Sequence, residues 1–218
     1  SITRPSYTAL NPFTFFLNEN TVVVGNPNLV PTYKDHYKIG VSFLEYFTVE
    51  AYYMNFDGAI LELPRQNNET NIIAHTPTNL DKMVDYGFDF AFDFYPTNTW
   101  NLYFVTSFYN ISQETNFGEG FVELSQWSNY SELSNNLSVL KDNSLNLNLT
   151  LTWVGKSLID LSSVEDRLFS SLSISKSLFN KKAIISLTVE DLFNYQNETY
   201  NINYLNQLST SFTDVDSR

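Results

Sequence analysis

The sequence predicts an all-β protein made of antiparallel strands. Three observations lead to this fold class: apolar residues recur at every second position, aromatic residues are abundant, and turn residues separate the alternating segments. Tyr and Phe number 14 and 18 among 218 residues, and these side chains favour strands over helices. The clearest alternation lies in residues 85–96, where one face carries Phe88, Phe90, Phe92 and Phe94. The opposite face of the same segment carries Asp85, Asp89 and Asp93.

Further segments repeat this alternation and are predicted to be strands with one apolar and one more polar face. In chain order they are residues 33–43, 47–54, 145–153 and 183–190. Asp35 is the polar exception on the apolar face of the first of them. Residues 99–110 also predict a strand, although its two faces are less distinct.

Residues 120–140 fit two descriptions. Trp127, Leu133 and Leu137 fall at a spacing that also suits the apolar stripe of a helix. The high Asn and Ser content disfavours a helix, because these side chains compete for backbone hydrogen bonds. We therefore predict a strand here.

Short and long connections alternate along the chain. The short turns are predicted near residues 44–46, 96–99, 141–144 and 179–182. The longer connections are predicted near residues 11–32, 63–81, 113–119, 156–163 and 195–212. All but the first short turn contain the Asn, Asp, Pro or Ser residues expected of tight turns. Roughly nine strands and the start of a tenth fit this arrangement, and no domain boundary interrupts it.

The regular sorting of connections separates two β architectures. A soluble sandwich also alternates, but its Greek-key connections do not sort into short and long. Outer-membrane barrels combine short periplasmic turns, long external loops and alternating segments of about ten residues. At a tilt of about 40°, residues 145–153 span roughly 20 Å of height, close to the ~25 Å apolar band. The sequence thus predicts an up-and-down transmembrane β-barrel with apolar faces toward lipid and polar faces toward an aqueous lumen.

Aromatic residues and strand phase add two expectations. Aromatic side chains flank the short turns, and Trp153 lies at the opposite end of its strand, so two interfacial girdles are predicted. Those near the turns are Tyr46, Phe47, Phe94, Tyr95 and Trp100. In the first hairpin we expect Ser42 opposite Glu50, which places Gly40 opposite Tyr52 and Lys38 opposite Met54.

Composition excludes several classes of protein. Charged residues make up only 17% and the formal net charge is −12, so a nucleic-acid partner is not expected. Cysteine is absent, which excludes a disulfide scaffold and thiolate chemistry. No stretch has the length of a transmembrane helix, and no signal peptide opens the sequence. Neither end resembles a natural terminus, so we expect part of a longer protein.

No catalytic, metal or cofactor site is predicted, and the protein is not expected to be an enzyme. The histidines His36 and His75 are far apart in sequence, and His36 is expected to be a structural hydrogen-bonding group. The GKS tripeptide at 155–157 lacks the upstream glycine of a phosphate loop.

The aspartates Asp85, Asp89 and Asp93 allow a hydrolase pair or a cation site, but a solvated lumen wall is the preferred interpretation. Asp89 and Asp93 are expected about 13 Å apart, too far to act together.

Ligand specificity is expected in the long connections, because loops on a rigid scaffold carry binding. The candidate segments are residues 11–32, 63–81 and 195–212, and no individual contact residue is predicted. Asn-x-Ser/Thr sequons, for example at Asn68, Asn110 and Asn197, carry meaning only in a secreted eukaryotic protein.

Several segments resemble the C-terminal half of TonB-dependent receptor barrels, most closely the outer-membrane β-barrel family abundant in Bacteroidota. The resemblance rests first on residues 4–13 followed by residues 25–43. The matching positions in the second segment are Gly25, Asn26, Pro27, Asn28, Leu29 and Pro31. Thr32 stands where the family usually has an acid. Residues 75–90 resemble the family's entry from a loop into a strand, and residues 173–194 resemble its penultimate hairpin.

This resemblance implies a barrel of about 22 strands with an N-terminal plug, which takes up a ligand with energy delivered through TonB. Residues 1–218 are then the C-terminal part of one barrel, and the plug and the final strand lie outside them. The implied ligand is a glycan, peptide or metal chelate, and the location is the bacterial outer membrane. The expected partners are outer-membrane lipid and lipopolysaccharide, TonB through an N-terminal region, and a surface lipoprotein or other complex subunits.

Two alternatives stay open. One is a barrel subunit of an outer-membrane assembly or secretion complex that does not transport. The other is a secreted, soluble β-sandwich adhesin.

Overall fold

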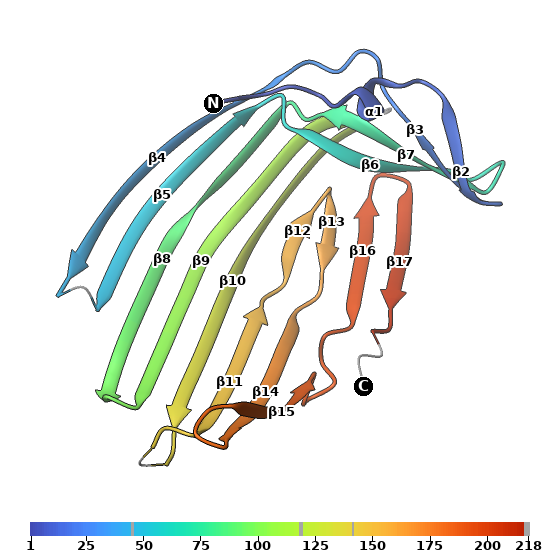
Figure 1. The fold of residues 1–218 in the computed structure, drawn as a ribbon. Helices are drawn as coiled ribbons and strands as arrows, with labels where there is room; N and C mark the ends of the chain where they lie inside the picture. The colour runs from blue at the N-terminus through green and yellow to red at the C-terminus, as the bar shows by residue number, and fades with distance from the viewer. Residues whose placement is uncertain (45, 118–119, 141, 216–218) are drawn as a thin grey trace.

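The computed structural model describes residues 1–44, 46–117, 120–140 and 142–215. Its largest element is a curved nine-stranded sheet in the order β1-β4-β5-β8-β9-β10-β11-β14-β15, with antiparallel neighbours throughout (Figure 1). Its strands are β1 (Ile2–Thr3), β4 (Thr32–Phe43), β5 (Phe47–Asp57), β8 (Lys82–Thr97), β9 (Trp100–Phe117), β10 (Gly120–Ser138), β11 (Leu145–Val154), β14 (Arg167–Leu178) and β15 (Ala183–Glu190). Among the described residues the sheet is open rather than closed, with β1 and β15 at its edges.

Each alternating segment of the sequence forms a strand of this sheet, so the all-β prediction is confirmed. The segment around Trp127 is strand β10 and not a helix. It pairs with β9 over nearly its whole length and with β11 from Tyr130 to Ser138. Its Asn and Ser residues therefore lie in a continuous strand ladder, where neighbouring strands supply the partners of the backbone hydrogen bonds.

The predicted register of the first hairpin is wrong by two residues. Ser42 lies opposite Thr48, and the two hydroxyl oxygens are 3.0 Å apart. Gly40 lies opposite Glu50, and Lys38 lies opposite Tyr52. The turn is tighter than expected because Leu44 adopts a positive φ of 51° and Phe43 pairs directly with Phe47. A shift of two keeps every side chain on its predicted face, since the strand period is two.

The short turns are confirmed, and Figure 1 shows them together at one end of the sheet. Glu45 and Lys141, which belong to two of the predicted turns, lie outside the described residues.

The prediction of irregular long connections is wrong, because most of them contain hairpins that build two further four-stranded sheets. One sheet, in the order β2-β3-β7-β6, contains β2 (Thr14–Asn18), β3 (Thr21–Val24), β6 (Ile60–Asn67) and β7 (Ile72–Asn79). The other, in the order β12-β13-β16-β17, contains β12 (Ser157–Ile159), β13 (Ser162–Val164), β16 (Glu198–Tyr204) and β17 (Gln207–Thr213). The single helix of the described residues, α1 (Tyr7–Leu10), is one turn long. No helix in the described part of the chain is long and apolar enough to cross a membrane.

The connection predicted near residues 113–119 is also wrong. Strand β9 continues to Phe117 and β10 begins at Gly120, while residues 118–119 lie outside the described part of the chain. Gln113 shows why a polar segment remains a strand. Its side chain is buried, and its Oε1 accepts a hydrogen bond from the backbone nitrogen of Leu161 at 3.1 Å. Polarity here serves a buried contact, so it does not mark a loop.

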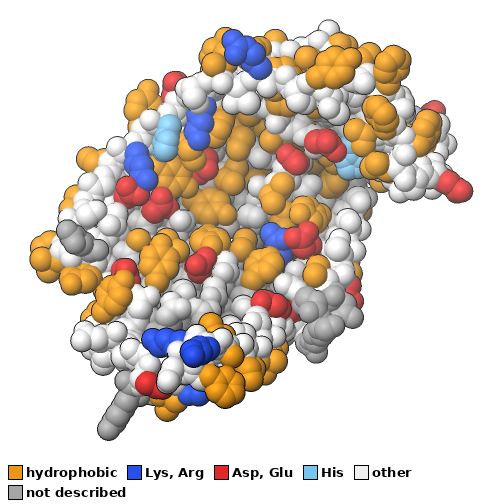
Figure 2. Space-filling view, viewed as in Figure 1, with side chains coloured by type: hydrophobic (Ala, Val, Ile, Leu, Met, Phe, Trp, Pro, Cys, Tyr) orange, Lys and Arg blue, Asp and Glu red, His pale blue; other side chains and the backbone are white. Residues whose placement is uncertain are grey.

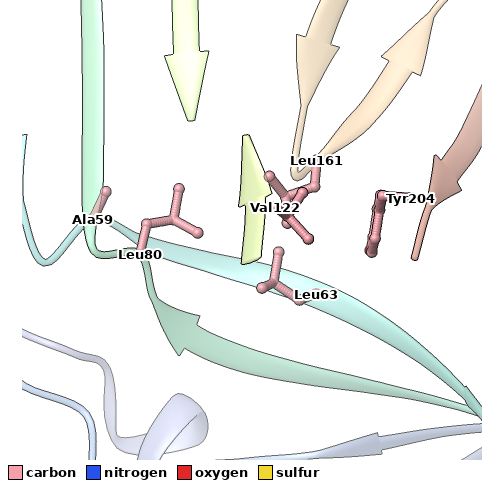
Figure 3. Close-up of a cluster of buried hydrophobic side chains, with 6 residues drawn as sticks. All are labelled: Ala59, Leu63, Leu80, Val122, Leu161 and Tyr204. Atoms are coloured by element: carbon pink, nitrogen blue, oxygen red, sulfur yellow. The ribbon is translucent and has the colours of Figure 1, made fainter. Parts of the chain in front are cut away.

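The hydrophobic core lies at the end of the large sheet that is opposite the short turns. Figure 3 shows the six side chains that form it: Ala59, Leu63, Leu80, Val122, Leu161 and Tyr204. They come from hairpins β6–β7, β12–β13 and β16–β17, from the wall strand β10, and from the connections of β6–β7 to the large sheet, where Ala59 and Leu80 lie. The backbone nitrogen of Gln66 also donates to Oε1 of Gln207 at 2.6 Å. The hairpins are therefore fixed to one another and to the sheet.

The segment beginning at Gly25 ties the N-terminal region to β7. A Cβ at Gly25 would lie 2.2 Å from the carbonyl oxygen of Asn11, so only glycine fits. The backbone nitrogen of Asn26 donates to the carbonyl of Ala9 at 2.7 Å, and its side-chain nitrogen donates to the carbonyl of Pro77 at 3.1 Å. Gly25 and Asn26, which match the pattern of receptor barrels, thus have a structural role.

Leu161→Ala is expected to destabilise the docking of hairpin β12–β13 by about 2–4 kcal/mol, because it removes a fully buried side chain from the core. Hydrogen exchange of the β12–β13 amides measures this opening directly. Leu208→Ala is the matched control, since Leu208 is 75% exposed on the neighbouring hairpin. Equal exchange rates in the two variants would contradict the role given to the core.

Candidate functional site: the two faces of the sheet

Strand pairing assigns each residue of the large sheet to a face, because directly paired residues point to the same side. One paired row runs across six strands through Gly40, Glu50, Asp89, Ser107, Tyr130 and Val154. The neighbouring row, on the opposite face, contains Ile39, Ala51, Phe88 and Phe108. The polar and apolar faces predicted from single strands therefore align across most of the sheet. On β10 the apolar face also carries Asn129, Ser131 and Asn135.

The apolar face is exposed on the isolated sheet. Large side chains with more than a third of their surface exposed include Ile39, Val41, Phe43, Phe88, Phe92, Phe94, Ile185 and Leu187. Phe90 and Leu147 share this face and are half-buried between their neighbours. Exposed apolar side chains in this number are unfavourable in water and match the lipid-facing band of a membrane barrel.

An aromatic row crosses the apolar face toward the end where the hairpins lie. Tyr37, Tyr53 and Tyr86 are directly paired on neighbouring strands, and Trp127 follows beyond Asn110. The ring centroids of Tyr86 and Trp127 are 5.4 Å apart in an edge-on arrangement. Asn110 is buried beneath this row, and its side-chain nitrogen donates to Ser125 at 3.1 Å. The row has the composition of an interfacial girdle, in which apolar rings carry polar tips.

The aromatic groups predicted to flank the short turns are exposed there. They are Tyr46, Phe47, Phe94, Tyr95 and Trp100, whereas Trp153 lies at the opposite end of β11 and stacks on Tyr195 with ring centroids 6.3 Å apart. Beyond the row of Tyr86 and Trp127, Lys82 pairs with Glu114 at 2.8 Å. The outer surface thus turns polar above this row.

The polar face carries a ladder of side-chain hydrogen bonds across β9, β10 and β11. The side-chain nitrogen of Asn136 donates to Asn101 at 3.4 Å, and that of Asn148 donates to Asn136. Nearer the short turns, the hydroxyl of Ser138 donates to Asn146 at 2.7 Å. Such a ladder is stable on a surface that contacts water, and it would be costly against lipid.

Charged side chains gather on the polar face over β4, β5 and β8, on the hollowed side of the molecule (Figure 2). Nζ of Lys38 lies 2.6 Å from Oε2 of Glu50. Gly40 makes room for this pair, because a Cβ there would lie 2.7 Å from the Glu50 side chain. The hollowed side is therefore the wet side, which matches a lumen wall.

The structure gives Asp85 and Asp93 separate partners. The hydroxyl of Tyr52 donates to Asp85 at 3.1 Å, whereas Asp93 accepts from Asn101 at 2.6 Å and from Tyr95. Asp89 lies between them opposite Glu50 and Ser107. The three aspartates therefore share the predicted face without converging on one point.

The other singled-out residues have structural contacts. The His36 ring lies edge-on to Tyr52, with ring centroids 6.5 Å apart. His75 lies in the sheet of β2, β3, β6 and β7, where its Nδ1 is 3.3 Å from Oε1 of Glu62. The backbone nitrogen of Gly155 donates to the carbonyl of Asn129 at 2.7 Å, so the GKS segment joins β12 to β10. In the described part of the chain, no three His, Cys, Asp or Glu residues gather in a way that could hold a metal ion.

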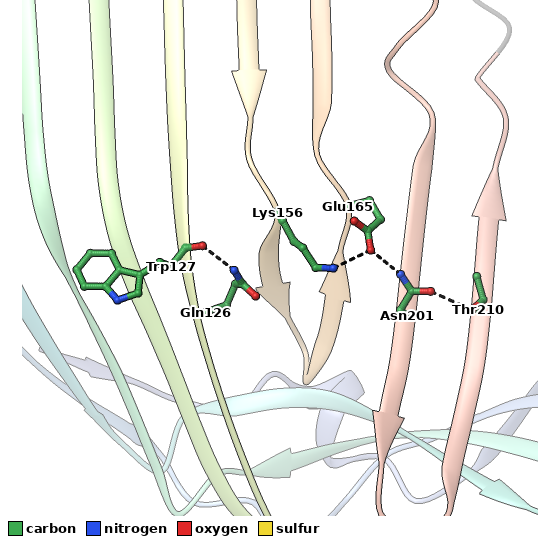
Figure 4. Close-up of polar contacts among 6 residues, drawn as sticks. All are labelled: Gln126, Trp127, Lys156, Glu165, Asn201 and Thr210. Atoms are coloured by element: carbon green, nitrogen blue, oxygen red, sulfur yellow. Dashed lines mark hydrogen bonds and ion pairs between the residues drawn. The ribbon is translucent and has the colours of Figure 1, made fainter.

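Sequence patterns did not identify a second polar wall at the sheet of β12, β13, β16 and β17 (Figure 4). Asn201 and Thr210 lie on β16 and β17, while Lys156 directly precedes β12 and Glu165 directly follows β13. These strands are short, and the prediction treated them as loops. One sequence feature could have indicated this wall. Lys156 and Leu158 have even numbers, as do the residues on the polar face of the predicted strand 145–153.

Comparison with known proteins supports the membrane assignment. The model of the outer membrane protein beta-barrel family matches residues 1–218. The comparisons with curated proteins and with solved structures give no match. The match covers the whole chain and agrees with the orientation of the two faces, and it excludes the soluble adhesin.

Leu149→Arg is expected to destabilise the inserted protein by about 2–4 kcal/mol, because it places a charge on the lipid-facing side of β11. The control is Thr150→Arg on the adjacent, polar face, which is expected to change stability much less. Urea unfolding in lipid vesicles measures both values. A larger loss for the Thr150 variant would reverse the assignment of the faces.

Stability of the β12–β13 turn is expected to depend on pH. Burial, with a smaller effect from nearby Glu62, raises the pKa of Asp160 above its ordinary value. The folded state thus binds this proton more tightly than the unfolded state, so docking strengthens as pH falls toward the ordinary aspartate pKa. It weakens as pH rises through the raised value.

Asp160→Asn is expected to slow the opening of this hairpin at neutral pH and to remove this pH dependence. Hydrogen exchange of the β12–β13 amides at pH 4, near the ordinary aspartate pKa, and at pH 7, corrected for the intrinsic rates, measures both effects. Unchanged protection in the variant at both values would contradict the unfavourable burial of the carboxylate.

Proposed function

The chain belongs to the outer membrane protein beta-barrel family and lies in the bacterial outer membrane, and on this premise we propose that it is the C-terminal barrel portion of a TonB-dependent-type receptor. This receptor takes up a glycan, a peptide or a metal chelate. The observation that carries the proposal is the combination of a lipid-facing apolar belt, a hydrogen-bonded polar lumen wall and ordered hairpins at the long-loop end. Long loops on that end of a barrel face the outside of the cell. Ligand arriving from outside therefore meets the hairpins first.

The open edges of the large sheet support a barrel larger than the described strands. On its outer side β4 pairs with only two residues of β1, and β15 pairs with β14 alone among the described strands. Unpaired backbone groups each cost several kcal/mol in hydrocarbon. We therefore assign further strands to both edges, with the plug and the TonB-contact region outside residues 1–218.

The outer surface suits the expected lipid partners. The apolar belt contacts acyl chains, and the polar surface beyond the row of Tyr86 and Trp127 lies at the level of lipopolysaccharide head groups. A surface lipoprotein or another complex subunit has access to the exposed sides of the hairpins. In this proposal the protein is a transporter and not an enzyme, in keeping with a family that is typically non-enzymatic.

A barrel subunit that does not transport is the second candidate. The observation that favours it is the buried core joining three hairpins, because such interlocked hairpins oppose the opening of a passage. The two candidates differ in their need for energy from the inner membrane. A receptor engages TonB, whereas an assembly or secretion subunit does not.

Binding of the purified C-terminal domain of TonB to the full-length, detergent-solubilised protein tests the proposal. Saturable binding is expected for the receptor. The Leu161→Ala variant is the control, since it loosens the hairpins and leaves the periplasmic side unchanged. Absence of TonB binding, in protein that remains heat-modifiable and outer-membrane-inserted, would favour the complex subunit.

A further inference from the structure

The sheet of β12, β13, β16 and β17 continues the barrel wall beyond the membrane. β12 follows β11 directly, and Gly155 holds it to β10 through two hydrogen bonds, one to Asn129 and one from Ser128. Lys156 thus extends the polar-face positions of β11, which include Thr152 and Val154. The face that carries Lys156 is the lumen-side face of this extension, which we call the vestibule wall.

Side chains on the vestibule wall form one paired row. Leu158, Ser163, Asn201 and Thr210 lie directly opposite one another across the four strands. In the neighbouring row Lys156 lies beside Glu165, with 2.9 Å between Nζ and Oε1. Ser163, Asn201 and Thr210 come from paired strands, which fixes their positions. Lys156 lies directly before β12 and Glu165 directly after β13, and the backbone nitrogen of Glu165 donates to the carbonyl of Thr199 at 3.0 Å.

Hydrogen bonds fix the polar groups of this wall relative to one another. The side-chain nitrogen of Asn201 donates at 2.9 Å to the same Glu165 oxygen that contacts Lys156. The hydroxyl of Thr210 donates at 2.9 Å to the side-chain oxygen of Asn201 (Figure 4). A preorganised set of this kind binds a ligand with little loss of side-chain entropy.

A cavity of about 360 Å³ lies against the vestibule wall. Its volume is within the range of small-molecule sites, which is roughly 300–1,000 Å³. The polar side is lined by Lys156, Ser163 and Asn201, and the apolar side by Leu124 and Leu208. Oγ of Ser163 is buried and has no hydrogen-bond partner in the described part of the chain. A buried hydroxyl without a partner is unfavourable, so this wall can accommodate one more polar group.

The charges of the wall cancel locally. Lys156 and Glu165 are the charged residues of the two rows, and they neutralise each other. A carboxylate ligand would compete with Glu165 for Lys156, and an amine would compete with Lys156 for Glu165. Hydroxyl and amide groups can use the remaining donors and acceptors without breaking this pair.

We propose that this cavity binds a small uncharged molecule that presents hydroxyl or amide groups to the vestibule wall and an apolar edge to Leu124 and Leu208. The site rests on the proposed function, in which ligand enters from the external end. Its chemistry suits either a sugar ring or a neutral peptide unit. It disfavours anionic chelates.

Calorimetric titration of the full-length protein in detergent tests the site. The probes are a neutral disaccharide and a dipeptide blocked at both ends, each with an amine-bearing and a carboxylate-bearing analogue. Binding of a neutral probe, tighter than that of its charged analogues, is expected, and the probe that binds identifies the source. No binding of any neutral probe, or equal binding of the charged analogues, would overturn the proposal.

Two charge variants supply a signature that a purely structural role does not produce. Lys156→Gln removes the cationic partner of Glu165 and leaves only the hydrogen bond from Asn201, so the affinity for the amine-bearing analogue is expected to rise by about threefold or more. Glu165→Gln is expected to raise the affinity for the carboxylate-bearing analogue instead. Lys82→Gln is the matched control, because it breaks a similar ion pair, 2.8 Å from Glu114, on the outer face. Equal changes in all three variants would contradict the site.

TonB binding separates failure of this site from failure of the proposed function. Saturable TonB binding without any neutral-probe binding overturns the site and leaves the receptor assignment in place. Neutral-probe binding without TonB binding supports the site and contradicts the receptor assignment.

Discussion

Satisfaction of backbone hydrogen bonds between strands is the constraint on which the rest of the structure depends. In hydrocarbon no water can complete a broken ladder, so each strand that crosses the membrane must be paired along its length. Pairing fixes the register, and the register fixes the face to which each side chain points. The row through Gly40, Glu50 and Asp89 is polar because these residues are paired partners. The apolar belt and the lumen ladder are thus two consequences of one hydrogen-bond pattern.

The strands and their faces could be predicted from the sequence because a period of two is a local signal. Phe88 and Asp89 indicate opposite faces without knowledge of any other strand. Register is not local, and this explains why Ser42 was placed opposite Glu50 although it pairs with Thr48. The tight turn depends on the positive φ of Leu44, which nothing in its residue type indicates.

The hairpins beyond the membrane could not be predicted for a different reason. Four of their strands, β2, β3, β12 and β13, have only three to five residues, too few to show a clear alternation. What orders them is tertiary contact: Leu161 enters a core shared by several segments, and Gln113 accepts a hydrogen bond from its backbone. The vestibule wall with Lys156, Glu165 and Asn201 follows from that docking. The assignment of ligand specificity to the long connections stays a prediction, and the residues of the proposed vestibule site come together only through the pairing of β13 with β16.

The apolar belt, the polar ladder and the hairpins have separate places in a membrane barrel. In the proposed receptor, the belt holds the protein in the membrane, the ladder lines a wet passage, and the hairpins form an ordered entrance above it. Each layer uses the same period of two, and only the environment of the two faces changes with height. Above the row of Tyr86 and Trp127 both faces meet water, which is why the ion pair of Lys82 and Glu114 is tolerated on the outer side.

The orientation of β11 tests this account most directly. The sequence contains no cysteine, so single cysteines at Leu147, Asn148, Leu149 and Thr150 can each carry a spin label without background. In lipid vesicles, we expect collisions with dissolved oxygen to dominate at the two leucine positions and collisions with a water-soluble nickel chelate at Asn148 and Thr150. The opposite alternation of the two collision rates, or no alternation, would show that the apolar face of this sheet does not face lipid.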